Sequence, residues 1–233
     1  MASRTRPTIG FSDAVRDRAL TAMLVVQCVI AFLAVPLATA HVRGARTVVE
    51  ILFLLFGALV IVISRGLIAM AIAVVGLILI SASTILTFIV PLSSLAWLAQ
   101  IGNFAGGSVV GVVVGRAVLG PGKVTPHRVI GAIVIYLTIG LLFATLYRLL
   151  WDLDPVSLAG IGSTADPSHA AGSILYFSFA TLTTVGYGDI IPVHPLARSL
   201  SNLESIIGQL YPATLLARLL MLEFDVAKMR GSR

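Results

Sequence analysis

Charged residues are scarce in this sequence: only 11% of its 233 residues are Asp, Glu, Lys or Arg, whereas 58% are hydrophobic. Soluble domains carry about 25% charged residues, so the composition excludes an ordinary soluble protein. The hydrophobic residues come in runs that approach the roughly 20 residues a helix needs to cross the hydrocarbon core of a bilayer. We therefore expect a protein that resides in a lipid bilayer.

Other absences narrow the functional classes. The single cysteine, Cys28, excludes an intrachain disulfide. The four histidines lie apart, with no metal-ligand spacing, and there is no nucleophile–base pair or phosphate-binding loop. The basic residues are scattered at the ends of hydrophobic runs rather than clustered, which argues against a nucleic-acid partner. We therefore expect neither an enzyme nor a bound cofactor.

The hydrophobic runs predict an all-α membrane protein with transmembrane helices at residues 20–40, 48–64, 67–90, 95–118, 129–151 and 196–222, six in total. The connectors are short except for residues 152–195. That connector contains a hydrophobic segment too short to span a bilayer, so we predict a re-entrant helix over 173–182.

Lys and Arg placement predicts the orientation of these spans. With the N-terminus inside, twelve of the 16 Lys and Arg residues fall on inner segments and four on outer ones. Cytoplasmic segments carry such an excess of basic residues. We therefore expect a multi-pass protein of the plasma membrane with both termini in the cytoplasm and the connector 152–195 outside.

The stretch TLTTVGYGD, at residues 181–189, is polar and rich in glycine. Non-helical backbone at membrane depth must be buried in protein or line a water-filled path. Gly186 and Gly188 tolerate backbone angles that other residues do not, which allows successive carbonyls to point the same way. A row of carbonyl oxygens above the Thr184 hydroxyl can replace the water shell of a monovalent cation. Asp189 would add negative charge at the outer mouth.

The pentapeptide from Thr184 to Gly188 resembles the selectivity-filter signature of the potassium channel family. The order of outer helix, pore helix, filter and inner helix agrees, and the strong match covers residues 127–225. The resemblance implies a homotetramer with one loop per chain and K⁺ as the permeant ion. It implies that Thr183 supports the filter and that K⁺ is coordinated at the first four of the five ion-binding filter residues: Thr184, Val185, Gly186, Tyr187 and Gly188.

The resemblance also suggests a division of the chain into four parts. These are a cytoplasmic tail, a four-helix transmembrane domain, a pore domain and a second cytoplasmic tail, at residues 1–18, 19–120, 127–225 and 226–233. The pore domain departs from many relatives in its pore helix, where Tyr176 and Ala180 replace a tryptophan and a carboxylate. Tyr176 is still able to hydrogen-bond to Asp189, which makes both of them filter-support residues.

The last span contains an ionisable residue, Glu204, which is costly inside a bilayer and marks a functional hypothesis. Two interpretations remain open: a buried brace for the pore helix, with Ser178 or Thr181 as partner, and a direct ion site. Gly208 and Pro212 weaken helical hydrogen bonding, so they form either a gating hinge or a fixed kink. Gln209 is a candidate to face the water-filled cavity.

Three functions compete at this point. The first is a K⁺-selective channel. The second is a subunit of a K⁺ uptake transporter, although such systems usually carry four degenerate loops in one chain, whereas this chain has one complete loop. The third is a non-conducting regulatory or structural membrane subunit, against which the intact pentapeptide argues.

The fourth span predicts weak voltage dependence. Each charge that crosses the field contributes about 2.3 kcal/mol per 100 mV, and the only basic residue in 95–118 is Arg116, at the inner end. We therefore expect currents through the protein in a planar bilayer to change little with voltage. A steep conductance–voltage curve that needs several gating charges would contradict this expectation.

Overall fold

The computed structural model describes residues 11–40, 42, 44–63, 70, 71, 74, 75, 77, 78, 82, 96–119, 126–162 and 167–231. Within these residues the chain is mostly helical. The long helices are α1 (Phe11–Val29), α3 (Ala45–Ile63), α5 (Ala96–Leu119), α6 (Pro126–Leu153), α7 (Pro167–Leu182) and α8 (Pro195–Gly231).

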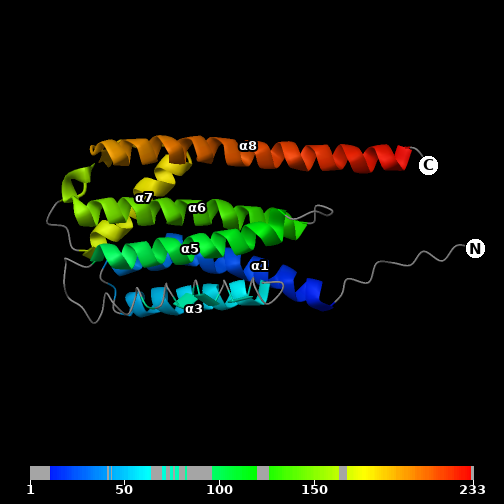
Figure 1. Ribbon diagram of the computed structural model, residues 1–233, viewed down its shortest axis with the longest axis horizontal. Coiled ribbons are helices and arrows are strands. Elements are labelled where there is room, and N and C mark those ends of the chain that lie inside the picture. Colours follow the sequence, from blue (N-terminus) through cyan, green and yellow to red (C-terminus); the bar gives the residue numbers. More distant parts are fainter. Residues whose placement is uncertain are drawn as a thin grey trace, which may run out of the picture.

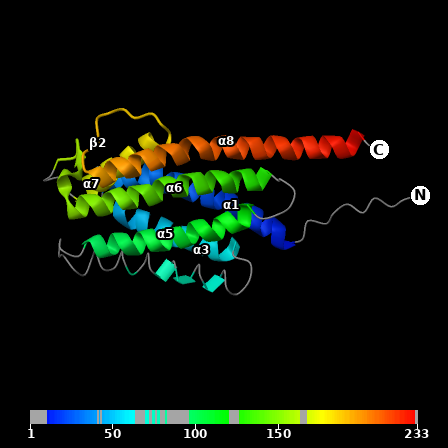
Figure 2. The same ribbon diagram turned by 45° about the horizontal axis from the view of Figure 1, so that its top comes forward.

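The helices α1, α3, α5, α6 and α8 run side by side along the long axis of the molecule (Figure 1). The first residues of α1 and the last residues of α8 lie at the same end of this bundle. The shorter helix α7 packs against both α6 and α8 near the opposite end (Figure 2). In the described part of the chain, the start of α1 and the end of α8 therefore lie at one end, and the polar connector lies at the other.

The first predicted span is interrupted. Helix α1 is followed by a π-helical segment, Ile30–Ala34, and by the short helix α2 (Val35–Thr39). Val35 donates its N–H to the carbonyl of Ile30, five residues back. Pro36, the next residue, has no N–H to donate, so regular α-helical bonding cannot continue through it. A single π turn inside an α-helix absorbs one extra residue in this way.

Two helices among the described residues are long and apolar enough to cross a membrane, Arg18–Leu37 and Val129–Leu153, and a shorter apolar stretch covers Ile51–Ile61. The observed ends of α3, α5 and α6 lie within three residues of the predicted spans. Most of the predicted span 67–90 lies outside the described residues. The mostly helical membrane architecture thus agrees with the sequence, while the six-span count stays a prediction.

The buried side chains form two clusters that share α6. The first lies between α1, α3, α5 and the start of α6 and includes Met23, Val60 and Val114. The second lies between the end of α6, α7 and the start of α8 and includes Tyr147 and Ile174. Helix α6 therefore joins the N-terminal helices to the connector that contains the glycine-rich loop.

The connector itself is fixed by a small antiparallel sheet. Strand β1 (Leu158–Ala159) pairs with β2 (Ile191–Pro192), with Leu158 opposite Pro192. Helix α7 ends at Leu182, as the sequence predicts, but begins at Pro167, six residues before the predicted start. Proline at the first position of a helix is favourable because its missing N–H has no helical partner there anyway.

Candidate functional site

The segment after α7 is attached to the end of that helix through its own peptide N–H groups. Thr184 donates to the carbonyl of Thr181, with 2.9 Å between nitrogen and oxygen. Val185 and Gly186 both donate to the carbonyl of Ala180, at 2.9 and 3.1 Å. Thr183 continues the last turn, because its N–H and its hydroxyl both donate to the carbonyl of Phe179.

These bonds determine the direction of the carbonyls. The described chain has no cis peptide bonds, and in a trans peptide the C=O of one residue and the N–H of the next point in opposite directions. Since Val185 and Gly186 direct their N–H groups at one oxygen, the carbonyls of Thr184 and Val185 both point away from α7. In an ordinary strand successive carbonyls would point to opposite sides.

The backbone angles have the matching alternation. Thr184, Gly186 and Gly188 have φ values of 59°, 54° and 80°, whereas Val185 and Tyr187 between them do not have positive φ. Positive φ is costless for glycine but costs an ordinary L-residue roughly 1–2 kcal/mol. Thr184, a β-branched residue, is the single described non-glycine residue with positive φ. Such strain tends to cluster at functional sites.

The outer end of the loop packs against Gly160, the residue that follows β1. Gly160 has a φ of 94°, and a Cβ at this position would collide with the carbonyl oxygen of Asp189. The Asp189 carboxylate accepts a hydrogen bond from the N–H of Ile190 at 3.1 Å. Gly160 is a residue of the site that the sequence did not single out, although an isolated glycine beside a strand is a signal for close backbone approach.

Tyr176 supports the loop from the pore helix. Its ring stacks on that of Tyr187, with 5.8 Å between the centroids. The hydrogen bond from the Tyr176 hydroxyl to Asp189 that the sequence suggested stays a prediction. In the single chain Val185 and Tyr187 are 54% and 70% exposed, so neither side chain is covered by its own chain.

Glu204 lies at a junction of three helices. Its side chain is 0% exposed. Oε1 accepts a hydrogen bond from Ser178 of α7 at 2.6 Å, and Oε2 accepts one from Tyr147 of α6 at 2.8 Å. The Ser178 hydroxyl also lies 2.8 Å from the carbonyl of Gly140. Ser178 is a partner that the sequence suggested, whereas Tyr147 was missed. The geometry favours a brace between helices, and the functional role of Glu204 stays a prediction.

Gly208 and Pro212 lie where α8 passes the end of α7. A Cβ at Gly208 would collide with the backbone carbonyl of Leu182, so the contact admits only glycine. Pro212 lies four residues further on within the same continuous helix. Because proline has no N–H, the carbonyl of Gly208 lacks its usual helical donor. The carbonyl without a helical donor therefore belongs to the residue that contacts α7 directly; whether α8 bends there as a hinge stays a prediction.

Gln209, the next residue, reaches the loop. Its side-chain nitrogen Nε2 lies 3.1 Å from the Thr184 hydroxyl oxygen. The carbonyl of Leu182, which Gly208 contacts, accepts a hydrogen bond from the Tyr136 hydroxyl of α6 at 3.2 Å. The sequence suggested that Gln209 faces the cavity but did not determine how α8 is rotated, so its contact with Thr184 was not predicted.

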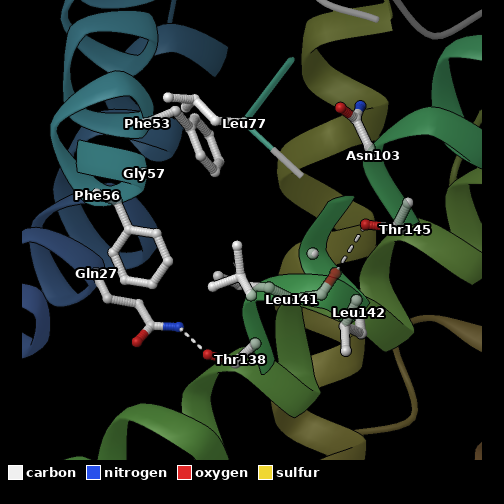
Figure 3. Close-up of a pocket in the computed structure, with 12 residues that line it drawn as sticks. Gln27, Phe53, Phe56, Gly57, Leu77, Asn103, Thr138, Leu141, Leu142 and Thr145 are labelled. Carbon is white, nitrogen blue, oxygen red and sulfur yellow. Dashed lines mark hydrogen bonds between the residues drawn. The ribbon is translucent and has the colours of Figure 1, made fainter. Parts of the chain in front are cut away.

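A pocket of about 190 Å³ lies elsewhere, between α1, α3, α5 and α6 (Figure 3). Its walls are mainly apolar and include Phe56 and Leu142. Its polar groups bond to the protein: the Gln27 amide lies 3.0 Å from the Thr138 hydroxyl, and Thr145 donates to the carbonyl of Leu141 at 2.9 Å. The pocket contains none of the residues of the glycine-rich loop.

Comparison with known proteins points to the same region. Residues 135–223 match the family model described as "Ion channel". A 46-residue segment, 20% of this chain and 10% of the relative, is 46% identical to the two pore potassium channel c of Oryza sativa subsp. japonica. A 76-residue segment, 33% of this chain and 23% of the relative, is 37% identical to the inward rectifier potassium channel Kirbac3.1 of Paramagnetospirillum magnetotacticum. The matches thus span less than a quarter of either relative.

The outer helix, re-entrant helix, loop and inner helix therefore define an ion channel domain. The two relatives are potassium channels, in agreement with the resemblance carried by Thr184 to Gly188.

The Gly208 contact predicts a stability defect for Gly208→Ala. The added methyl group meets backbone rather than a flexible side chain, and overpacking of this kind costs about 1–3 kcal/mol. We expect a lower midpoint of thermal unfolding for the purified protein in detergent. Gly115→Ala is the matched control, because a Cβ at Gly115 meets nothing within 4 Å. Equal midpoints for the two variants would contradict the packing role.

The junction at Glu204 predicts different thermal stabilities for two substitutions. Glu204→Ala leaves the buried hydroxyl of Tyr147 without its partner, and an unsatisfied buried polar group costs about 1–3 kcal/mol. Ser178 keeps only the carbonyl of Gly140. Glu204→Gln keeps the side-chain volume. The amide oxygen still accepts a hydrogen bond from Tyr147, and the new N–H group faces Ser178. We expect the midpoint of thermal unfolding to stay close to that of the wild type for E204Q and to fall clearly for E204A. An E204A variant as stable as E204Q would show that the brace is unimportant.

Proposed function

We propose that this chain is the subunit of a K⁺-selective channel, in which dehydrated K⁺ passes through a filter of backbone carbonyls. The observation that carries the proposal is the shared direction of the carbonyls of Thr184 and Val185, which follows from the two N–H bonds to Ala180. Carbonyl oxygens arranged in this way replace the hydration shell of a potassium ion. The residues proposed to form the site are Thr184, Val185, Gly186 and Tyr187.

A homotetramer is part of the proposal. A single chain contributes one row of carbonyls, whereas an ion without its water shell needs oxygens on all sides, which four loops around one axis supply. Two further observations support assembly. Val185 and Tyr187 are largely exposed apolar side chains in the single chain, and the inner helix exposes Leu203, Ile206 and Leu210. Neighbouring copies of the chain would cover them.

The proposed orientation places the start of α1 and the end of α8 on the cytoplasmic side of the plasma membrane. The excess of Lys and Arg on the predicted inner segments supports it. So does the arrangement of the helices, because α1 begins and α8 ends at the same end of the molecule (Figure 1). The glycine-rich loop would then lie toward the outer face, with Asp189 at the mouth.

The proposal predicts selective flux. Purified protein in liposomes should pass K⁺ and Rb⁺, exclude Na⁺ and be blocked by Ba²⁺. Gly186→Ala should abolish the flux, because Gly186 has a φ of 54° and any side chain there is strained. Gly115→Ala is the control and should conduct like the wild type.

Three results would count against the proposal. Equal Na⁺ and K⁺ flux would contradict the selectivity of the filter. A protein that assembles as a tetramer but passes no ion would favour a non-conducting regulatory or structural subunit, and flux that depends on an additional subunit would favour an uptake transporter.

A further inference from the structure

The contact between Gln209 and Thr184 joins the inner helix to the first residue of the carbonyl row. The amide nitrogen of Gln209 lies 3.1 Å from the Thr184 hydroxyl oxygen. Both residues are exposed in the single chain, so burial does not force the two groups together. The contact depends instead on Gly208, whose missing side chain lets α8 approach the carbonyl of Leu182.

The Thr184 hydroxyl is the group of the loop that most needs such a contact. A backbone carbonyl is fixed by its peptide plane, and the N–H bonds to Ala180 hold those planes in place. The direction of the Thr184 hydroxyl depends, in contrast, on which staggered rotamer the side chain adopts. A β-branched side chain has few rotamers available, so one hydrogen bond is enough to favour one of them.

The chemistry of a hydroxyl allows it to bond to Gln209 and to a cation at once. A hydroxyl oxygen has one proton and two lone pairs. The N–H of Gln209 occupies one lone pair, and the second stays available for a cation on the side of the carbonyl row. The hydrogen bond thereby selects one rotamer without using up the oxygen.

We infer that Gln209 is a positioning residue for the innermost cation site, because its amide holds the Thr184 hydroxyl oxygen toward the permeant ion. This inference rests on the proposed function and deepens it: the cation site includes a side chain of the inner helix in addition to the loop. An inner-helix movement at Gly208 or Pro212 would then alter the innermost site directly through Gln209.

The test uses Ba²⁺, a divalent cation close to K⁺ in size, applied from the side where α8 ends, so that it meets Thr184 first. Block of K⁺ current in planar bilayers is compared for wild type, Gln209→Met and Gln100→Met. Methionine matches glutamine in length but has no N–H. Gln100 lies on α5, which packs on α3 and α6, so the same chemical change is made away from the loop.

We expect Gln209→Met to weaken Ba²⁺ block about five- to tenfold, as the loss of one hydrogen bond implies, and Gln100→Met to leave it unchanged. The thermal unfolding midpoint of Gln209→Met should equal that of the wild type, since the side chain is exposed; a purely structural role would lower it. Gln209→Glu, which brings a negative charge to the same place, should strengthen the block.

The outcomes separate this inference from the proposed function. A wild-type protein that passes no K⁺ overturns both. A conducting wild type whose Ba²⁺ block is unchanged in Gln209→Met and in Gln209→Glu overturns the role of Gln209 alone. A lower unfolding midpoint in Gln209→Met together with unchanged block would show that the contact only stabilises the helix pairing.

Discussion

The carbonyl of Ala180, at the end of the pore helix, determines the geometry of the whole loop. It accepts the N–H groups of both Val185 and Gly186, and because peptide units are planar and trans, two successive carbonyls must point away from the helix. The positive φ of Thr184, Gly186 and Gly188 is the backbone response to this requirement. Glycine meets it without strain at two of the three positions, while Thr184 accepts the strain and contributes a hydroxyl.

Three contacts of α8 hold this arrangement in place. Glu204 joins α8 to Ser178 and Tyr147, Gly208 lets α8 touch the carbonyl of Leu182, and Gln209 reaches Thr184. These contacts lie within a little more than one turn of α8. The inner helix is therefore attached to the pore helix and to the loop along one short segment, next to the carbonyl that Pro212 leaves without a helical donor. A displacement of α8 would therefore move the loop first.

Part of the fold and of the site could be predicted from the sequence, and each feature that was missed has a physical reason. The re-entrant helix was expected because residues 172–182 are apolar but too short to span, and its end at Leu182 agrees with the structure. The partners of Gly160 and Tyr147 could not be predicted, since both partners, Asp189 and Glu204, are distant in sequence. The π segment at Ile30–Ala34 was missed because a single proline gives no indication of how the helix will accommodate it.

We propose that four copies of the loop surround a bare monovalent cation with the carbonyls of Thr184 to Tyr187. Anomalous diffraction from crystals of the protein grown in Rb⁺ tests this arrangement. We expect a line of anomalous peaks on a fourfold axis, level with these carbonyl oxygens, and the loss of the peaks when Na⁺ replaces Rb⁺. An ordered loop around an axis with no anomalous peaks, or an assembly that lacks fourfold symmetry, would contradict it.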